Sequence, residues 1–146
     1  MDTKFSIAIH VLILISESPK PLSSEQMARS AGTNASYVRK VLAALKRAGI
    51  VSSRQGVEGY ALAIPPDQLP LLRIYQAVSG GPAYHLIDIH QNPSDQCIVG
   101  RHIKPTLTSA FANVEEAFAR ALEEKTLAGC ITDMRMRIQE REAVQP

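Results

Sequence analysis

The sequence contains no tryptophan, and aromatic residues of all kinds make up only 5% of its 146 residues. Because aromatic rings supply much of the buried area in most cores, this core has to be mainly aliphatic, which suits packed helices better than a β-sandwich. Disorder is excluded as well, since 45% hydrophobic and 21% charged residues form an ordinary globular balance. The length is that of about one typical domain.

Long hydrophobic runs are missing too. The longest nearly apolar run, FSIAIHVLILI, is too short to cross a bilayer and is interrupted by Ser6 and His10. It also lacks a basic leader and a cleavage site, so we interpret it as a core helix. Only two cysteines are present, and without a secretion signal they indicate reduced thiols. We therefore expect a cytoplasmic protein with no membrane partner.

Motifs of catalysis are also absent from the sequence. There is no phosphate-binding glycine loop, no clustered carboxylate pair and no nucleophile elbow, and the four histidines are scattered. An isolated histidine such as His10 is more often a satisfied core residue than a catalytic base. We predict that the protein is not an enzyme.

Positive charge, in contrast, is concentrated in one part of the chain. Between Lys20 and Tyr60 seven basic residues stand against two acidic ones, a balance of +5. The whole chain carries only +2, so the remainder carries −3. This asymmetry suggests a module that faces a polyanion, joined to a neutral or acidic one.

The N-terminal part of the chain predicts two helices. Residues 2–17 are apolar nearly all round, so a helix there would be largely buried, and Pro19 would end it. Ser23 or Ser24 can cap a second helix of about two turns, which ends at Gly32.

A third, amphipathic helix follows after only a few residues. Asn34 or Ser36 can cap it, and Gly49 lies where a left-handed residue is wanted at its end. Two short helices joined by a tight turn with glycine are typical of a helix-turn-helix. Apolar and basic residues separate around the third helix, with Val38, Val41, Leu42 and Leu45 on one face and Arg39, Lys40, Lys46 and Arg47 elsewhere.

A short hairpin is predicted directly after this helix. The runs IVSSR and YALAI have strand propensity and flank QGVEG, whose glycines tolerate a turn. A hairpin in this position is a wing. A further helix is expected from near Asp67 to Gly80. The predicted fold is therefore mainly α with a small β wing.

A basic helix followed by a hairpin is suited to binding double-stranded DNA. The major groove admits a helix, whose polar N-terminal end contacts base edges while basic residues hold phosphates. The alternative is a solvated charged helix in some other small domain. The candidate DNA-binding residues are Ser24, Asn34, Ser36, Tyr37, Arg39, Lys40, Arg54 and Gln55, the last two near the tip of the wing.

The region from SSEQMARSAG to IYQAVSG resembles the winged-helix region of the Rrf-two family of bacterial transcriptional regulators. The resemblance depends on a helix-ending AG followed by two aliphatic residues, a glycine-containing turn ending in G-Y-x-L-A, and an A-V-x-G helix end. One departure is the turn itself, which places Glu58 close to where phosphate would lie. The matching residues are Tyr37, Leu45, Ala48, Gly49, Ile50, Val51, Ser53, Gly56, Gly59, Tyr60, Leu62, Ala63, Ala77, Val78 and Gly80.

The resemblance also bears on cofactors. The best-known branch of the family holds an iron–sulfur cluster through three closely spaced cysteines, whereas this chain has only Cys97 in that region. Rescue by His85, His90, His102 or a second subunit is the alternative, and the spacing fits no zinc pattern. We therefore expect no cofactor and no metal, and a place in a lone-cysteine branch of the family.

Cys97 is the candidate sensor. With Ser94 as a helix cap, Cys97 would be the third helical residue, where the helix dipole, Arg101 and His102 favour a thiolate and Asp95 opposes it. Other members resemble this C-x-V-G-R-x-I arrangement, and some sense oxidants or electrophiles through it. The alternative is that Cys97 is a small buried hydrophobe. Cys130 is predicted to lie in the core.

A long amphipathic helix is predicted over residues 106–125, and a last amphipathic stretch begins at Leu127. A shorter helical segment before them is expected to end before Pro105. The family carries a dimerisation helix in this position, and a helix-turn-helix gains specificity from two half-sites, so we expect a homodimer rather than packing within the chain alone. The predicted dimer contacts are Leu107, Phe111, Val114, Phe118 and Leu122.

Together these features predict a DNA-binding regulator, most simply a repressor that responds to an oxidant or electrophile through Cys97. The predicted parts are a winged helix-turn-helix over residues 1–82, a connector with the sensor over 83–104 and dimerisation helices over 105–146. Two alternatives stay open. The same DNA reader could respond to a small molecule or metal centre without Cys97, or the winged helix could serve as a protein–protein adaptor.

Overall fold

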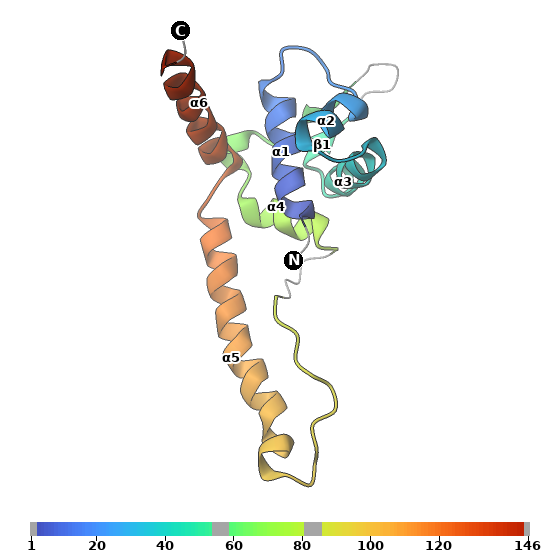
Figure 1. Cartoon of the computed structure of the whole chain (residues 1–146), viewed down its shortest axis with the longest axis vertical. Helices are drawn as coiled ribbons and strands as arrows, with labels where there is room; N and C mark the ends of the chain where they lie inside the picture. Colours follow the sequence, from blue (N-terminus) through green and yellow to red (C-terminus); the bar gives the residue numbers. More distant parts are fainter. Residues whose placement is uncertain (1–2, 54–58, 81–85, 145–146) are drawn as a thin grey trace.

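The computed structural model describes residues 3–53, 59–80 and 86–144. Figure 1 shows two parts, a packed bundle of short helices and the long helix α5, which extends away from it. The mainly helical fold with a small antiparallel wing is confirmed. The elements in chain order are α1 (Lys4–Glu17), α2 (Ser24–Ala31), α3 (Ala35–Arg47), β1 (Val51–Ser52), β2 (Ala61–Leu62), the 3₁₀ helix η1 (Pro66–Gln68), α4 (Leu71–Val78), α5 (Ile98–Glu123) and α6 (Leu127–Val144).

The core lies where α1 meets α3 and α4. Ala8 and Leu12 of α1 are fully buried, together with aliphatic residues of α3, β1 and α4. Leu127 and Ile131, at the start of α6, belong to the same buried cluster. The core is almost purely aliphatic, as the shortage of aromatic residues predicts, and it draws on both ends of the chain.

The helix-turn-helix forms as its caps predict. Ser23 caps α2 in a reciprocal box with Gln26, in which the Gln26 amide donates to Ser23 Oγ (3.2 Å) and the Ser23 amide donates to Gln26 Oε1 (2.8 Å). Ser24 is therefore the first helical residue rather than the cap. Gly32 ends α2 with a left-handed φ of 73°, and Asn34 caps α3. This tight turn sets the direction in which α3 leaves α2.

The wing is a two-stranded antiparallel ribbon, with Val51 paired to Leu62 and Ser52 to Ala61. Its return strand begins after Gly59, whose φ is 92°. A Cβ atom added to Gly59 would lie 2.5 Å from Cβ of Pro21, so the wing packs closely against the loop between α1 and α2. Glycine is required at this position both for the backbone conformation and for the close approach.

The junction between α5 and α6 is tied to the segment before α4. The amide of Leu71 donates to the carbonyl of Lys125 (2.8 Å), and the amide of Leu127 donates to the carbonyl of Leu69 (2.9 Å). Both Leu69 and Leu127 are fully buried beside this pair of hydrogen bonds. The long helix is therefore fixed to the bundle at its C-terminal end.

The expected break before Pro105 is wrong, because α5 runs through it as one helix of 26 residues. Proline removes the amide that would donate to the carbonyl of Arg101, yet the turn stays helical. Two neighbouring hydroxyls make side-chain hydrogen bonds along this stretch, in which Thr106 Oγ1 donates to the carbonyl of His102 (2.8 Å) and Thr108 Oγ1 to that of Lys104 (2.7 Å). The predicted boundary between residues 104 and 105 thus falls inside a helix.

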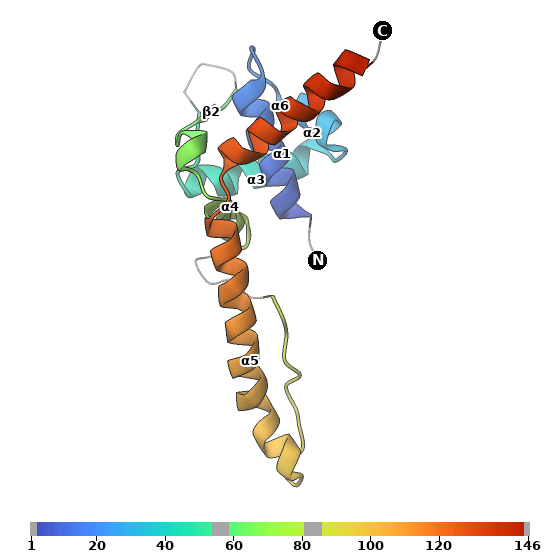
Figure 2. The ribbon, with the colours of Figure 1, turned by 90° about the vertical axis from the view of Figure 1, so that its left-hand side faces the viewer.

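Residues 86–97 run alongside the free half of α5 as an extended segment (Figures 1 and 2). The amide of Leu86 donates to Glu115 Oε2 (3.1 Å), and Lys104 Nζ lies 3.5 Å from Gln91 Oε1. This segment covers one side of α5 and leaves the rest open. No helix among the described residues is long and apolar enough to span a bilayer.

Candidate nucleic-acid interface

Helix α3 presents a polar face outward and an apolar face to the core. Ser36, Arg39 and Lys40 are exposed at its N-terminal half, while Val38 and Leu42 are fully buried. The predicted separation of faces around this helix is therefore confirmed. The exposed face holds the hydrogen-bonding and basic groups with which a recognition helix contacts bases and phosphates.

Two of the predicted contact residues also stabilise the start of the helix. The side chain of Asn34 accepts a hydrogen bond from the Tyr37 amide (2.8 Å), so its carbonyl oxygen serves as the cap of α3. The ring of Tyr37 is half-buried against the core cluster. Both residues lie at the start of α3, where they fix its position, and Ser24 lies half-buried at the start of α2.

Two basic side chains on this surface make polar contacts with neighbouring elements. Arg39 forms an ion pair with Glu25 of α2 (3.4 Å) in which both side chains are largely exposed. An exposed pair of this kind is worth little, so Arg39 can exchange Glu25 for a phosphate. Lys46 Nζ donates to Ser53 Oγ (2.7 Å), which links the end of α3 to the wing.

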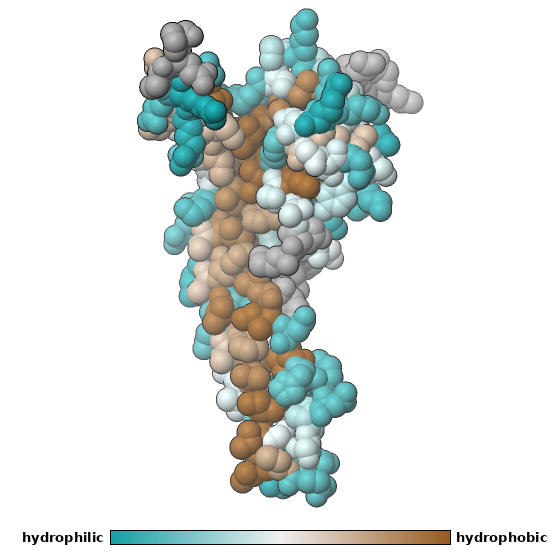
Figure 3. Space-filling model, viewed as in Figure 1, coloured by the Kyte–Doolittle hydropathy of each residue, from teal (hydrophilic) through white to brown (hydrophobic). Residues whose placement is uncertain are grey.

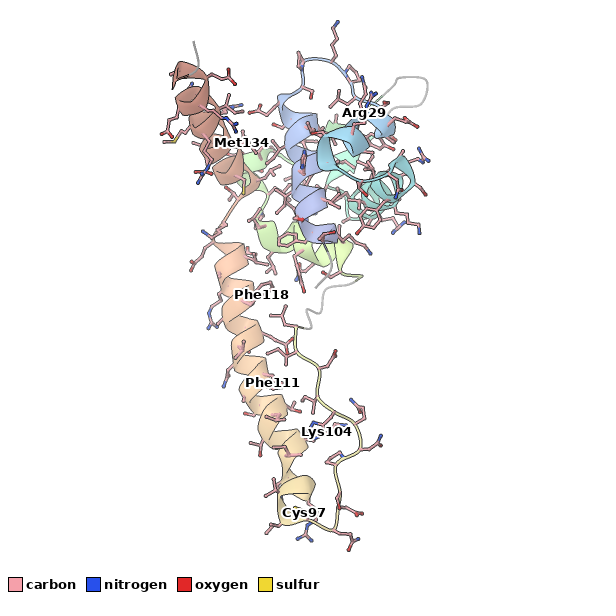
Figure 4. The ribbon with its side chains drawn as sticks, in the orientation of Figure 1. Arg29, Cys97, Lys104, Phe111, Phe118 and Met134 are labelled. Carbon is pink, nitrogen blue, oxygen red and sulfur yellow. The ribbon has the colours of Figure 1, made fainter. Side chains whose placement is uncertain are left out.

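Arg29 is a basic residue that the sequence pattern did not single out. It is exposed in the last turn of α2, on the same helix-turn-helix (Figure 4). The sequence did contain a sign of it, since Arg29 is one of the seven basic residues counted between Lys20 and Tyr60. Only the fold shows that it lies beside α3. Arg54 and Gln55, predicted at the tip of the wing, lie outside the described residues.

Cys97 is exposed at the far end of α5, so the alternative of a buried cysteine is wrong (Figure 4). The predicted helix start at Ser94 is also wrong, since α5 begins at Ile98 and Cys97 is its N-cap residue. Ser94 closes a turn instead, in which its Oγ accepts from the Gln96 amide (3.2 Å). A Cβ at Gly100 would lie 2.0 Å from the Ser94 carbonyl oxygen, so the turn presses against α5.

Cys130 lies near the start of α6 and is partly buried against the main core cluster, where it was predicted. It is far along the chain from Cys97 and lies beyond the C-terminal end of α5. Among the described residues no group of three or more His, Cys, Asp or Glu side chains comes together in a way that could hold a metal ion. His85 lies outside those residues.

The five residues predicted to form a dimer face lie differently along α5. Phe118 stacks edge-on against Tyr75, with ring centroids 5.4 Å apart, and Leu122 packs against the core. Leu107 and Phe111 are half-buried. Val114 is 51% exposed and has the largest free apolar surface of the five. Their common face is therefore shared between contacts within the chain and open surface.

Comparison with known proteins identifies the family of the chain. The model of the Rrf2 (Rrf-two) family, described as an iron-dependent transcriptional regulator, matches residues 1–133. YwnA of Bacillus subtilis strain 168, named as an HTH-type transcriptional regulator, is 38% identical over 127 residues, which cover 87% of this chain and 93% of YwnA. The regulator slr0846 of Synechocystis is 31% identical over 92% of this chain and 89% of its own length.

Solved structures agree with the fold. A crystal structure described as a DNA-binding protein superposes with a TM-score of 0.73 and 36% identity, over 88% of this chain and 98% of its own. A transcriptional regulator from Lactobacillus plantarum superposes with a TM-score of 0.75 over 98% and 99% of the two chains, and its 21% identity makes it evidence for the fold alone.

Proposed function

Because the chain belongs to the Rrf2 family and is a helix-turn-helix transcriptional regulator, we propose that it binds double-stranded operator DNA as a homodimer in the cytoplasm and represses the genes it controls. The observation that carries this proposal is α3, a capped helix whose exposed face holds Ser36, Arg39 and Lys40. Such a helix fits the major groove, and its basic residues suit the phosphates on either side.

The homodimer is supported by the surface of α5. Of its 26 residues only Ala119 is buried, although the helix carries an apolar face. Val114 in the middle and Ile98 at the end leave large apolar side chains in solvent. A monomer rarely leaves a continuous apolar band open, and a second copy related by a two-fold axis would cover it. Repression follows when such a dimer occupies an operator that overlaps a promoter.

We propose further that the chain belongs to a lone-cysteine branch in which Cys97 is the sensor. Its exposure at the start of a long helix gives an oxidant access to the sulfur. Peroxide would oxidise the thiolate to a sulfenic acid and release hydroxide, and a thiol reductant would restore it. The change would alter how the α5 helices of the two subunits pack, and with it the distance between the two α3 helices. This mechanism needs two global states of the dimer.

Iron has no part in this proposal. The family description names iron, but only Cys97 represents the cysteines of the cluster branch here, and the described residues bring no set of three donors together. One thiolate cannot hold an iron–sulfur cluster without further ligands.

The test is fluorescence anisotropy with the DNA just upstream of the protein's own gene, before and after mild peroxide, for the natural chain and for Cys97→Ser. Tight binding that falls steeply with salt would support the DNA reader, since phosphate contacts release counterions. Binding that weakens on oxidation in the natural chain alone would support the sensor.

Other outcomes separate the parts of the proposal. An equal response of Cys97→Ser would eliminate the thiol switch and keep the regulator. Failure to bind this DNA and a pool of genomic fragments would contradict operator binding and favour a protein–protein adaptor.

A further inference from the structure

Three aromatic rings meet where α5 joins the bundle. Tyr75 of α4 lies between Phe5 of α1 and Phe118 of α5, with ring centroids 5.2 Å and 5.4 Å away. Both pairs are edge-to-face, at interplanar angles of 84° and 74°. The chain has only three phenylalanines and four tyrosines, so this junction holds three of its seven aromatic rings. The rings are therefore concentrated where the two parts of the molecule meet.

Packing between rings constrains direction as well as distance. Aromatic pairs prefer edge-to-face or offset geometries, whereas the hydrophobic contact of aliphatic side chains has no preferred direction. Phe118 lies in the half of α5 nearest the bundle (Figure 4), and Figure 3 shows apolar surface continuing from α5 onto the bundle beside α1. Because Tyr75 is in contact with a ring on each side, a rotation of α5 against α4 would break an edge-to-face pair. The ring contacts thus fix the direction in which α5 leaves the bundle.

The rings supply a second point of attachment for α5. The first is the pair of backbone hydrogen bonds that join Leu69–Leu71 to Lys125–Leu127. Phe118 precedes this junction by about two helical turns, roughly 10 Å at 1.5 Å per residue. A helix held at the junction alone could swing about it. A slack of about 1 Å at the rings would tilt α5 by roughly 5–6°.

Such a tilt reaches the DNA-reading helix through α4, which contacts both α5 and α3. Ile74, next to Tyr75, is buried in one cluster with Val41 of α3. Arg73 Nη2 donates to the carbonyl of Ala48 at the end of α3 (3.4 Å). The bundle therefore transmits a movement of α4 to α3.

The size of this movement can be compared with the geometry of DNA. Packed helix axes lie about 8–10 Å apart, so α3, the second helix from α5, lies roughly 16–20 Å from it. A tilt of roughly 5–6° would then move each α3 by up to about 2 Å, and the two α3 helices of a dimer by about 3–4 Å together. One base pair rises about 3.4 Å along the duplex. A small slack at the rings is therefore enough to change the spacing of half-sites by one base pair.

We propose that Tyr75 is the positioning residue that sets the half-site spacing which the dimer accepts. This inference rests on the proposed homodimer that binds operator DNA. Tyr75 acts through its neighbours, because its ring holds α4, and with it α3, at a fixed angle to α5. The exposed face of α3 determines which bases are contacted, and the Tyr75 ring determines how far apart the two contacted sites lie.

The test compares half-site spacings on defined duplexes. A library of random-sequence duplexes is first selected with the natural chain, which identifies two half-sites and their separation. The selected duplex, versions with one base pair inserted or removed between the half-sites, and a duplex with a single half-site are then titrated by fluorescence anisotropy. Because a helix-turn-helix dimer binds half-sites at a defined separation, the ratio of affinities for the selected and altered spacings reports the geometry of the dimer.

We expect the natural chain to bind the selected spacing at least about 10-fold more tightly than either altered spacing. Tyr75→Leu should lower this spacing ratio to about two- to three-fold and leave the affinity for a single half-site unchanged. Tyr75→Phe keeps the ring and should keep the ratio. Partial unfolding lowers all affinities by the same factor, so a loss of stability alone does not change the ratio.

Two further variants separate ring packing from a general loosening of the bundle. Phe118→Leu should lower the ratio as Tyr75→Leu does, and it carries the test if Tyr75→Leu fails to fold. The double variant should lose no more than either single variant, because both substitutions break the same contact. Leu12→Ala is the matched control, since Leu12 is fully buried in α1. It should lower the free energy of unfolding but leave the ratio at its natural value.

Several results would overturn the role of Tyr75. An unchanged ratio in Tyr75→Leu and Phe118→Leu would contradict it and leave the DNA-binding homodimer intact. An equal loss in Leu12→Ala would show that any loosening of the bundle suffices. A loss in Tyr75→Phe would assign the effect to the hydroxyl and not to ring packing. Selection of a single half-site, or of no sequence at all, would contradict the proposed function itself, and the positioning role with it.

Discussion

The bundle that contains α3 and the arm formed by α5 differ in how many apolar side chains they bury. In the bundle, each helix from α1 to α4 buries between two and four side chains. In the arm, 26 residues bury one alanine. The bundle is complete within one chain, whereas the arm keeps its apolar face open.

In the proposed homodimer, this difference assigns folding to the bundle and association to the arm. Burial of apolar area is the main stabilising contribution to a fold, so the bundle can hold α3 in place by itself. The arm gains little from its own chain beyond its C-terminal end and the segment that runs beside it. We therefore expect substitutions in the bundle to affect folding and substitutions on the arm to affect association.

The largest effect is expected for Val114→Glu on the arm. If two arms pack through Val114, the substitution buries an unpaired charge from each subunit, and one such charge costs about 3–5 kcal/mol. The dimer should dissociate, and operator affinity should fall by more than about 100-fold because each half-site then binds alone. Sedimentation velocity and fluorescence anisotropy measure the two effects.

Ala112→Glu is the matched control for this change. Ala112 is exposed on the same helix, two residues away and on the opposite side. It should leave both association and DNA binding unchanged. A Val114→Glu protein that still sediments as a dimer would contradict the arm as the interface.

Leu42→Ala should have the next largest effect, this time within the bundle. Leu42 is fully buried in the cluster that joins α1, α2 and α3. Removing its side chain leaves a cavity, and the free energy of unfolding should fall by about 2–5 kcal/mol. Urea denaturation followed by circular dichroism measures it. Arg39→Ala, an exposed neighbour on the same helix, should change it by less than about 0.5 kcal/mol.

Lys40→Ala should weaken DNA binding without affecting the fold. If Lys40 contacts one phosphate, the slope of log affinity against log salt should become shallower by about 0.9. Arg120→Ala removes an exposed cation from the arm, where its partner Glu116 is 4.0 Å away, and should leave the slope unchanged. Equal slopes for Lys40→Ala and the natural chain would show that this side chain does not reach the backbone of DNA.

The smallest effect is expected for Glu17→Gln, which breaks an ion pair between α1 and α6. Hydrogen bonds from Arg135, the longer of 2.9 Å, hold the pKa of the Glu17 carboxyl below its ordinary value. The contribution is therefore present above the carboxyl pKa of the unfolded chain and is lost as the pH falls through the lower folded pKa.

Urea midpoints of the natural chain and Glu17→Gln should differ slightly at neutral pH and converge below about pH 4, where unfolded glutamates take up protons. Both side chains are open to solvent, so the difference should also shrink with added salt. A gap that persists unchanged in acid would indicate that packing rather than charge is affected.

Local patterns in the sequence were sufficient to predict the bundle. Caps at Ser23 and Asn34, the glycine after α2 and the apolar spacing of α3 act over a few residues, so they can be read without the fold. The arm was predicted less well. Proline usually ends a helix, and only the surroundings of Pro105 show that this one does not.

The candidate site was also predictable in part. Residue types and spacing placed the polar end of α3 correctly, but the spacing of Phe118 and Leu122 could not tell an intrachain neighbour from a second subunit. The position of Cys97 depended on where α5 begins, and helix ends are set by turns such as the one at Ser94 that pack against a later glycine. Such contacts leave no periodic signal.

The two hydrogen bonds between Leu69–Leu71 and Lys125–Leu127 have a consequence for how the chain is made. Leu127 and Ile131 complete a core whose other members were synthesised by Val78, roughly fifty residues earlier. At about 5–20 residues per second, translation of the intervening segment takes roughly 2–10 s. During that time the core lacks its last two residues and the Leu69 carbonyl lacks the Leu127 amide, so the core is closed only after the arm has been made.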